Sequence, residues 1–239
     1  MPETVREYFN RTAQAFASNY SDAPDFKERL RVWQRAIEKN IADITGRSVC
    51  LDMGCGDGSI CRQVAVRGIR TIGFDQSETM LVLARRRAAE YGVVPQTEYV
   101  RASIPLEKEL AGIYRDAAGL MICSSVLEYV SDYEEALRQF YSLLEPGGIL
   151  LLSLPNRLST YRIFERTLRR HIVRRDSYLR HQRHQFDSHE VRSLMTAIGF
   201  RTIDVEFFSL PLQSVTEKIV GSYRGRWLAT MFLVTAQKL

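Results

Sequence analysis

The feature that most constrains the fold is a turn with three glycines at alternate positions, Gly54, Gly56 and Gly58. A short apolar run that begins at Val49 leads into this turn, and apolar residues at helical spacing follow it. This order predicts a strand, a tight turn and a helix. Glycines allow positive φ angles and a close approach of the backbone to a ligand, while a helix start offers unpaired N–H groups. The turn therefore predicts a ligand site, with the carboxylate of Asp52 at its mouth.

A second apolar run, residues 69–74, ends in an acidic residue, Asp75. Asp75 lies about 20 residues after the first glycine, the separation over which a carboxylate reaches the two hydroxyls of a ribose. The alternative is that Asp75 caps a helix that begins after Ser77, and the two roles are compatible. A dinucleotide-binding motif has two residues before its third glycine, whereas here a single residue separates the last two glycines. The spacing therefore favours a nucleoside ligand other than NAD.

Two motifs resemble those of one enzyme family. Residues 51–58, Leu-Asp-Met-Gly-Cys-Gly-Asp-Gly, are similar to the first motif of the class I S-adenosylmethionine-dependent methyltransferases. Residues 145–154, which begin Glu-Pro-Gly-Gly, resemble the motif that leads into the fifth strand of that family. The resemblance extends over roughly Tyr8 to Lys238 and is to small-molecule enzymes of the type 11 or type 12 kind. It implies S-adenosylmethionine as cofactor and S-adenosylhomocysteine as product.

The same resemblance implies an α/β fold. The expected fold is a Rossmann-like, seven-stranded, mostly parallel sheet with helices on both faces, in which the last strand runs antiparallel between the fifth and the sixth. A chain of 239 residues is long enough for one such domain. We expect residues 1–239 to form a single domain, with N-terminal cap helices over about residues 3–45 and a basic lid inserted at about residues 156–186.

Composition argues against several other classes of protein. No apolar run approaches the about 20 residues that a helix needs to cross a bilayer, and the N-terminus lacks the basic and then apolar pattern of a signal peptide. We therefore expect a cytoplasmic protein. The four cysteines form no Cys-x-x-Cys pair and have no histidine cluster beside them, so the sequence predicts neither a metal site nor a disulfide framework.

Four polar side chains are expected to converge at one edge of the sheet. Asp52, Asp75, Ser103 and Ser124 lie at or just after the ends of predicted strands. Ligands of open parallel sheets bind beyond the C-terminal ends of the strands, so these side chains should meet despite their separation in sequence. In the family that the chain resembles, many members carry an Asp at the position of Ser103, where it reads the adenine amino group.

The resemblance assigns roles to nine residues in binding the cofactor. The backbone of the glycine turn faces the cofactor, Asp52 helps to hold the methionine ammonium group, and Asp75 receives the ribose hydroxyls. Gln76 and Met80 flank the adenine, and two serines complete the rim. The predicted cofactor-binding residues are Asp52, Gly54, Cys55, Gly56, Asp75, Gln76, Met80, Ser103 and Ser124.

The most biased segment of the chain is basic and covers residues 162–184. Apolar residues at helical intervals over residues 161–172 predict a basic amphipathic helix or lid. Its arginines are suited to clamp an acidic acceptor, to lie on an anionic membrane surface and reach a lipid-like acceptor, or to hold RNA, and a solvated helix without a partner is the alternative. His184 is the candidate catalytic base, with His181 and Glu128 as further candidates.

The chemistry that the resemblance implies is SN2 transfer of a methyl group from a sulfonium to a nucleophile, for which alignment of the reactants supplies about 7–11 kcal/mol. We expect a small-molecule acceptor, with oxygen slightly favoured, such as a natural product, quinone, sugar or lipid-like compound. Two alternatives remain open: an RNA methyltransferase that uses the basic lid, and a non-catalytic S-adenosylmethionine-binding protein. No Asn-Pro-Pro-Tyr motif follows the fourth strand, so DNA is not the expected acceptor, and the sequence predicts no oligomeric state.

Overall fold

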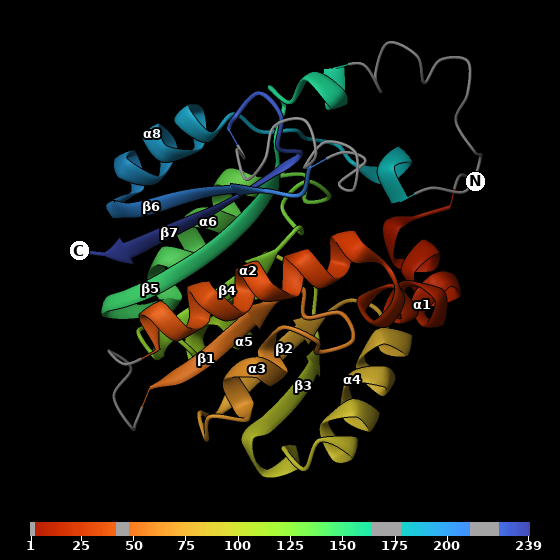
Figure 1. The fold of residues 1–239 in the computed structure, drawn as a ribbon. Helices are drawn as coiled ribbons and strands as arrows, with labels where there is room; N and C mark the ends of the chain where they lie inside the picture. Colours follow the sequence, from red (N-terminus) through yellow and green to blue (C-terminus); the bar gives the residue numbers. More distant parts are fainter. Residues whose placement is uncertain (1–2, 42–47, 164–177, 211–224) are drawn as a thin grey trace.

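The computed structural model describes residues 3–41, 48–163, 178–210 and 225–239. The strands are β1 (Val49–Met53), β2 (Thr71–Asp75), β3 (Thr97–Arg101), β4 (Ala118–Ser124), β5 (Leu144–Pro155), β6 (Phe200–Phe208) and β7 (Met231–Lys238). They form one seven-stranded sheet with the order β3-β2-β1-β4-β5-β7-β6 (Figure 1). Strands β1 to β5 pair in parallel, whereas β7 runs antiparallel between β5 and β6. The predicted Rossmann-like sheet with its antiparallel last strand is confirmed.

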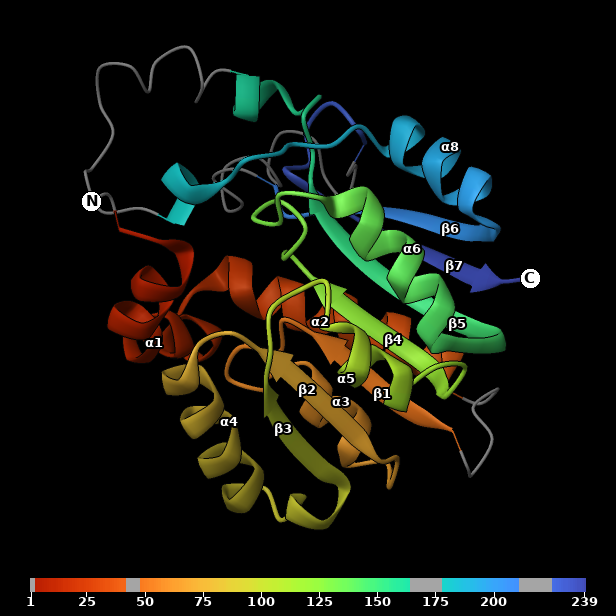
Figure 2. The same ribbon diagram turned by 180° about the vertical axis from the view of Figure 1, so that it is seen from behind.

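Helices cover both faces of this sheet, as predicted. The helices are α1 (Val5–Asp22), α2 (Pro24–Asn40), α3 (Cys61–Ala65), α4 (Glu78–Glu90), α5 (Lys108–Ile113), α6 (Tyr133–Leu143) and α8 (Ser188–Ile198), with short 3-10 helices η1 (Val94–Gln96) and η2 (Tyr178–His181). Helices α2, α3 and α4 lie on one face, and α5, α6 and α8 lie on the other (Figure 1, Figure 2). Helix α1 packs against α2, α4 and η2.

The two larger hydrophobic clusters lie on opposite faces of the sheet, because side chains alternate between the two faces of a strand. In β4, Met121 and Cys123 belong to the core under α6 and α8, whereas Leu120 and Ile122 belong to the core under α2 and α3. Trp33 of α2 is fully buried in this second core. The central strands are therefore predominantly apolar because both of their faces are covered.

The helix ends follow signals that are local in the sequence. Ser77 caps α4 by accepting a hydrogen bond from the N–H of Met80 at 3.2 Å. Asp132 and Asp187 cap α6 and α8 in the same way. Gly199 ends α8 with a φ angle of 122°, which a residue with a side chain rarely adopts.

The structure describes the N-terminal cap helices and the two ends of the basic lid. The helices predicted over about residues 3–45 are α1 and α2, and α2 ends at Asn40. The ends of the lid lie side by side, because Asn156 and Phe186 form a parallel bridge beside the C-terminal end of β5. Most of the predicted basic helix falls on residues 164–177, which lie outside the described residues.

Candidate functional site

A cavity of about 280 Å³ lies at the C-terminal ends of β1, β2 and β4, where the strand order reverses between β1 and β4. In sheets of this kind, ligands bind at that reversal. Its lining includes all nine predicted cofactor-binding residues, Asp52, Gly54, Cys55, Gly56, Asp75, Gln76, Met80, Ser103 and Ser124. The structure thus brings these residues together, and their individual roles toward a ligand stay predictions.

The glycine turn is held in place by backbone hydrogen bonds. The N–H groups of Gly54 and Cys55 both donate to the carbonyl oxygen of Phe74, at 2.8 and 2.9 Å. Gly54 has a φ angle of 79°, and a Cβ atom there would lie 2.3 Å from Cγ2 of Val126, so only glycine fits. Gly56 also has a positive φ angle, 53°, but a Cβ atom there would meet nothing within 4 Å. The backbone at Gly56 is therefore open to the cavity.

Asp75 braces both the turn and the start of α4. Its Oδ2 atom accepts a hydrogen bond from the N–H of Gly56 at 2.9 Å, and its Oδ1 atom accepts one from the N–H of Ser77 at 2.8 Å. Burial raises the pKa of Asp75, and these two backbone hydrogen bonds oppose the rise. The cap of α4 is Ser77 itself. Asp75 is therefore not the capping residue, and its carboxyl group lines the cavity.

Asp52 is a buried carboxyl group beside the turn. It is 1% exposed, and neither of its oxygens forms a hydrogen bond of normal geometry with any residue that the structure describes. Burial raises the pKa of Asp52 to about 7, although the nearby Cys61 lowers it. A cationic ligand group would favour the charged form of Asp52. The neighbouring acid Asp57 is already paired, with Arg87 of α4.

His184, the predicted base, does not line the cavity. Its ring centroid lies 4.9 Å from that of Tyr133 and 6.2 Å from that of Phe186. Its Nε2 atom is buried without a hydrogen-bond partner in the described part of the chain. The two residues before it, Gln182 and Arg183, do line the cavity. The role of His184 as a base therefore stays a prediction, with the ring beside the cavity rather than in its wall.

Glu128, a lesser candidate for the base, lies in the cavity wall. It is 1% exposed, and burial raises its pKa to about 7, while the nearby Arg29 and Arg162 lower it. Its carbonyl oxygen accepts a hydrogen bond from the N–H of Arg183 at 2.7 Å. This contact joins the loop after β4 to the end of the basic lid.

Part of the cavity wall comes from residues that the sequence analysis did not assign to the site. Phe9 and Phe16 of α1, and Phe26 and Arg29 of α2, line the cavity. The sequence does contain a signal for Arg29. It lies four positions before Trp33, so it places a charged residue on the apolar face of α2, which is unusual for a helix that only covers a sheet. We call the glycine turn and the ends of β1 and β2 the floor of the cavity, and α1, α2 and the described ends of the basic lid its roof.

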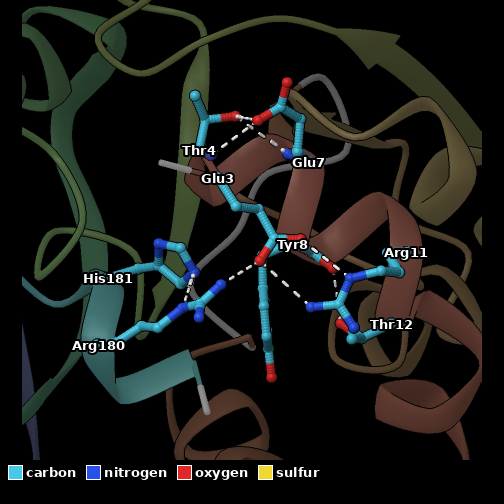
Figure 3. A network of polar contacts seen from close by, with 8 residues as sticks. All are labelled: Glu3, Thr4, Glu7, Tyr8, Arg11, Thr12, Arg180 and His181. Carbon is cyan, nitrogen blue, oxygen red and sulfur yellow. Dashed lines mark hydrogen bonds and ion pairs between the residues drawn. The ribbon is translucent and has the colours of Figure 1, made fainter. Parts of the chain in front are cut away.

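Side-chain contacts tie α1 to the end of the basic lid, as Figure 3 shows. Glu3 pairs with Arg11 of α1 at 2.9 Å and also with Arg180 of η2. The ring of Tyr8 lies 5.1 Å from the ring of His181. These contacts join segments that are far apart in sequence. We call this group the clasp of the roof.

Within the described ranges, no group of three or more His, Cys, Asp or Glu side chains is placed to hold a metal ion. The four cysteines are buried and form no disulfide. Over the same ranges, none of the helices combines the length and the apolar character needed to cross a bilayer.

The fold and the cavity together define a Rossmann-like α/β protein with a glycine turn in the wall of a cavity at the reversal of the strand order. A family model described as a methyltransferase domain matches residues 26–205. The chain therefore belongs to that methyltransferase-domain family, and the family expected from its motifs is confirmed.

The chain is similar in sequence to named methyltransferases over part of its length. It is 34% identical over 121 residues to the ubiquinone biosynthesis O-methyltransferase of Bordetella pertussis, a match that covers 51% of this chain and 48% of that protein. It is 33% identical over 116 residues to the protein of the same name from Pseudomonas aeruginosa, covering 48% of this chain and 47% of that one. The chain thus spans about half the length of the curated relatives it matches.

Solved structures share the fold over nearly the whole chain. The magnesium protoporphyrin IX methyltransferase of Synechocystis PCC 6803, with bound S-adenosylhomocysteine, has a TM-score of 0.72 and 19% identity over 98% of both chains. A methyltransferase from Thermotoga maritima, described as a possible histamine N-methyltransferase, has a TM-score of 0.65 and 16% identity over 98% of this chain and 100% of that one. At these identities the likeness shows the fold alone.

Proposed function

We propose that the chain transfers a methyl group from S-adenosylmethionine to a hydroxyl oxygen of a small molecule. The observation that carries this proposal is the meeting of the glycine turn, Asp52 and Asp75 around one cavity in a member of the methyltransferase-domain family. The names of the similar proteins, which are ubiquinone biosynthesis O-methyltransferases, support an oxygen acceptor. A cytoplasmic location is part of the same proposal.

Several features of the floor support S-adenosylmethionine as the ligand. The backbone at Gly56 borders open space, and Asp75 offers carboxylate oxygens for the ribose hydroxyls. The buried oxygens of Asp52 suit the methionine ammonium group, because a carboxylate and an ammonium form a charge-assisted hydrogen bond. Gln76 and Met80 would flank the adenine. When bound, the cofactor supplies an electrophilic methyl group on a positively charged sulfur.

The roof supports an acceptor that is partly apolar and acidic. Phe9, Phe16 and Phe26 supply aromatic surface, and Arg162 and Arg183 from the ends of the basic lid add positive charge. Aromatic walls suit a flat apolar ligand, and guanidinium groups suit a carboxylate or a phosphate. The proposal of an acidic acceptor depends only on Arg162 and Arg183, which the structure describes. Contact of the basic lid with a membrane surface is not part of this argument.

The part of the chain in the reaction is to align the acceptor, to exclude water and to control one proton. Residues of the roof line the cavity, which would favour a fixed orientation of the acceptor and fewer water molecules around it. A hydroxyl acceptor loses a proton as its oxygen attacks, and the candidate proton acceptors are the Glu128 carboxylate and Nε2 of His184. Burial raises the pKa of Glu128 to about 7, which suits proton transfer at neutral pH.

The test begins with calorimetric titration of the purified chain with S-adenosylmethionine and with S-adenosylhomocysteine. Methyl-labelled S-adenosylmethionine is then incubated with the chain and a set of hydroxylated aromatic acids, or with short RNA transcripts in a separate arm. We expect both nucleosides to bind and the label to reach a hydroxyl oxygen of an acid. Failure of both to bind would overturn the cofactor assignment. Label in RNA, or binding without any transfer, would favour the RNA methyltransferase or the non-catalytic alternative.

A further inference from the structure

Arg29 places a positive charge in the wall of the cavity. It lies on α2, one helical turn before the fully buried Trp33, so its side chain starts from the buried face of that helix. Its Nη2 atom donates a hydrogen bond to Oγ of Ser124 at 2.6 Å, across 95 positions of sequence. The guanidinium of Arg29 is therefore held at the C-terminal end of β4, inside the predicted site.

The guanidinium of Arg29 has no carboxylate in direct contact within the residues that the structure describes, although Glu128 is near enough for Arg29 to oppose the rise that burial causes in its pKa. Arg29 forms no ion pair there, and its Nε atom is buried without a hydrogen-bond partner. Other arginines differ: Arg35, also on α2, pairs with Glu206 at 2.6 Å, and Arg87 pairs with Asp57. Arg29 is half-buried. A guanidinium stays charged at physiological pH, and further removal of that charge from water is costly without an anion beside it. The arrangement fits an anion that a ligand would supply.

Glu128 is the acid whose titration Arg29 affects. Arg29 and Arg162 lower the pKa of Glu128, but burial dominates and leaves that pKa at about 7. The buried thiol of Cys123 lies beside Glu128, and burial and that carboxylate both raise the pKa of Cys123. The Oε2 atom of Glu128 has no hydrogen-bond partner in the described ranges. Near neutral pH, Glu128 is therefore only partly ionised and balances the charge of Arg29 only in part.

We propose that Arg29 binds a carboxylate of the ligand, through the guanidinium N–H groups that its bond to Ser124 leaves free. The inference rests on the proposed function and extends the site to a residue that the sequence analysis did not include. Two sources can supply the carboxylate: the amino-acid part of the cofactor, and an acidic acceptor. A charge-assisted bond of this kind is strong enough that its loss weakens binding about 10- to 100-fold.

The first experimental arm tests the cofactor as the source. Calorimetry compares S-adenosylhomocysteine with its decarboxylated analogue on the wild type, Arg29→Gln and Arg29→Lys. If the cofactor supplies the carboxylate, Arg29→Gln weakens S-adenosylhomocysteine about 10- to 100-fold and leaves the analogue unchanged. Arg29→Lys keeps the charge but not the planar fork, so its loss is intermediate. Arg31→Gln, an exposed position of α2, is the matched control and changes neither affinity.

The second arm tests the acceptor as the source. Chain saturated with S-adenosylhomocysteine is titrated with 3,4-dihydroxybenzoate and with catechol, which differ by one carboxylate. If the acceptor supplies the carboxylate, Arg29→Gln leaves the affinity for S-adenosylhomocysteine unchanged and removes a preference of about 10-fold for the benzoate. Arg31→Gln keeps that preference.

Three results would overturn the inference. The first is that the wild type binds both members of each pair equally, a comparison that does not depend on the folding of any variant. The second is that Arg29→Gln weakens the binding of S-adenosylhomocysteine and of its decarboxylated analogue by the same factor. The third is that Arg29→Gln has the same affinities as the wild type in both arms, including the case in which neither protein binds the benzoate. Failure of the wild type to bind S-adenosylhomocysteine at all would instead overturn the proposed function, and this inference with it.

Discussion

The floor and the roof of the cavity are built by different kinds of contact. The floor is held by backbone hydrogen bonds between adjacent strand ends, such as the bond of 2.8 Å from Gly54 to Phe74. The roof is joined by side chains, such as Glu3 and Arg180 in the clasp. Backbone bonds in a buried turn tolerate little change, whereas ion pairs between exposed side chains contribute little to stability. We infer that the floor keeps one ligand geometry and that the roof can vary with the acceptor.

The largest effect should follow from a side chain added to the floor. In Gly54→Ala the new Cβ atom would lie 2.3 Å from Val126, at a φ angle of 79°. Strain and overpacking should lower the free energy of unfolding by about 2–4 kcal/mol in urea titrations. Gly56→Ala is the matched control, because it has a positive φ angle but no atom within 4 Å of its Cβ, and it should lose only about 1 kcal/mol. Equal losses would show that close packing does not distinguish the two positions.

The next effect concerns ligand affinity. Asp75→Ala removes the acceptor of two backbone N–H groups in the floor and the predicted acceptor of the ribose hydroxyls. We expect the affinity for S-adenosylhomocysteine to fall about 100-fold in calorimetry, while the free energy of unfolding falls by only about 1–2 kcal/mol. Glu78→Gln, an exposed change on α4, should alter neither quantity. Unchanged affinity in Asp75→Ala would remove this residue from the cofactor site.

A smaller effect should depend on pH. Because burial raises the pKa of Asp52 to about 7, the folded chain retains a proton that the unfolded chain releases above about pH 4. The contribution of this carboxyl group to the free energy of unfolding therefore falls as the pH rises from about 4, near the unfolded-state pKa, to about 7, the folded-state pKa. Asp52→Asn should stabilise the unliganded chain more at pH 8 than at pH 5, by about 1–3 kcal/mol in urea titrations. The exposed change Asp204→Asn is the control and should change the free energy of unfolding equally at the two pH values. If Asp52→Asn also showed no difference between pH 8 and pH 5, the raised pKa of Asp52 would be contradicted.

The smallest effect should come from the clasp of the roof. Glu3→Gln breaks the pairs with Arg11 and Arg180 and should leave the unfolding temperature unchanged, because exposed pairs add little stability. S-adenosylhomocysteine should dissociate about twofold faster in stopped-flow measurements, since the roof opens more readily. About 0.5 M NaCl should bring the wild-type rate to that of the variant by screening. Glu134→Gln on α6 is the control, and equal rates for wild type and Glu3→Gln in low salt would exclude a clasp.

Most of the floor could be predicted because its signals are short in range. The glycine turn and Ser77, which caps α4 just after β2, each depend on residues within a few positions of themselves. The meeting of Asp75 with the turn follows from parallel pairing of β1 and β2, which the apolar runs already indicate. The prediction of His184 as a base depends on residue type alone, and its ring lies against the rings of Tyr133 and Phe186, outside the cavity wall.

The roof was less predictable because its contacts join distant segments. Arg29 enters the site through a bond to Ser124, 95 positions away, and no local pattern contains that pairing. Phe9 and Phe16 have the spacing of an ordinary amphipathic helix, and only the packing of α1 against α2 and α4 places them in the cavity wall. The clasp between Glu3 and Arg180 is a pairing of the same kind.

The sequence by itself determined the class of fold, the family and the composition of the floor, because strand periodicity, glycine conformation and helix caps are properties of neighbouring residues. The tertiary structure decided which charges face the cavity and how they titrate. Burial and pairing depend on every segment packed around a group, so the raised pKa of Asp52 and the position of the Arg29 charge beside Ser124 exist only in the folded chain.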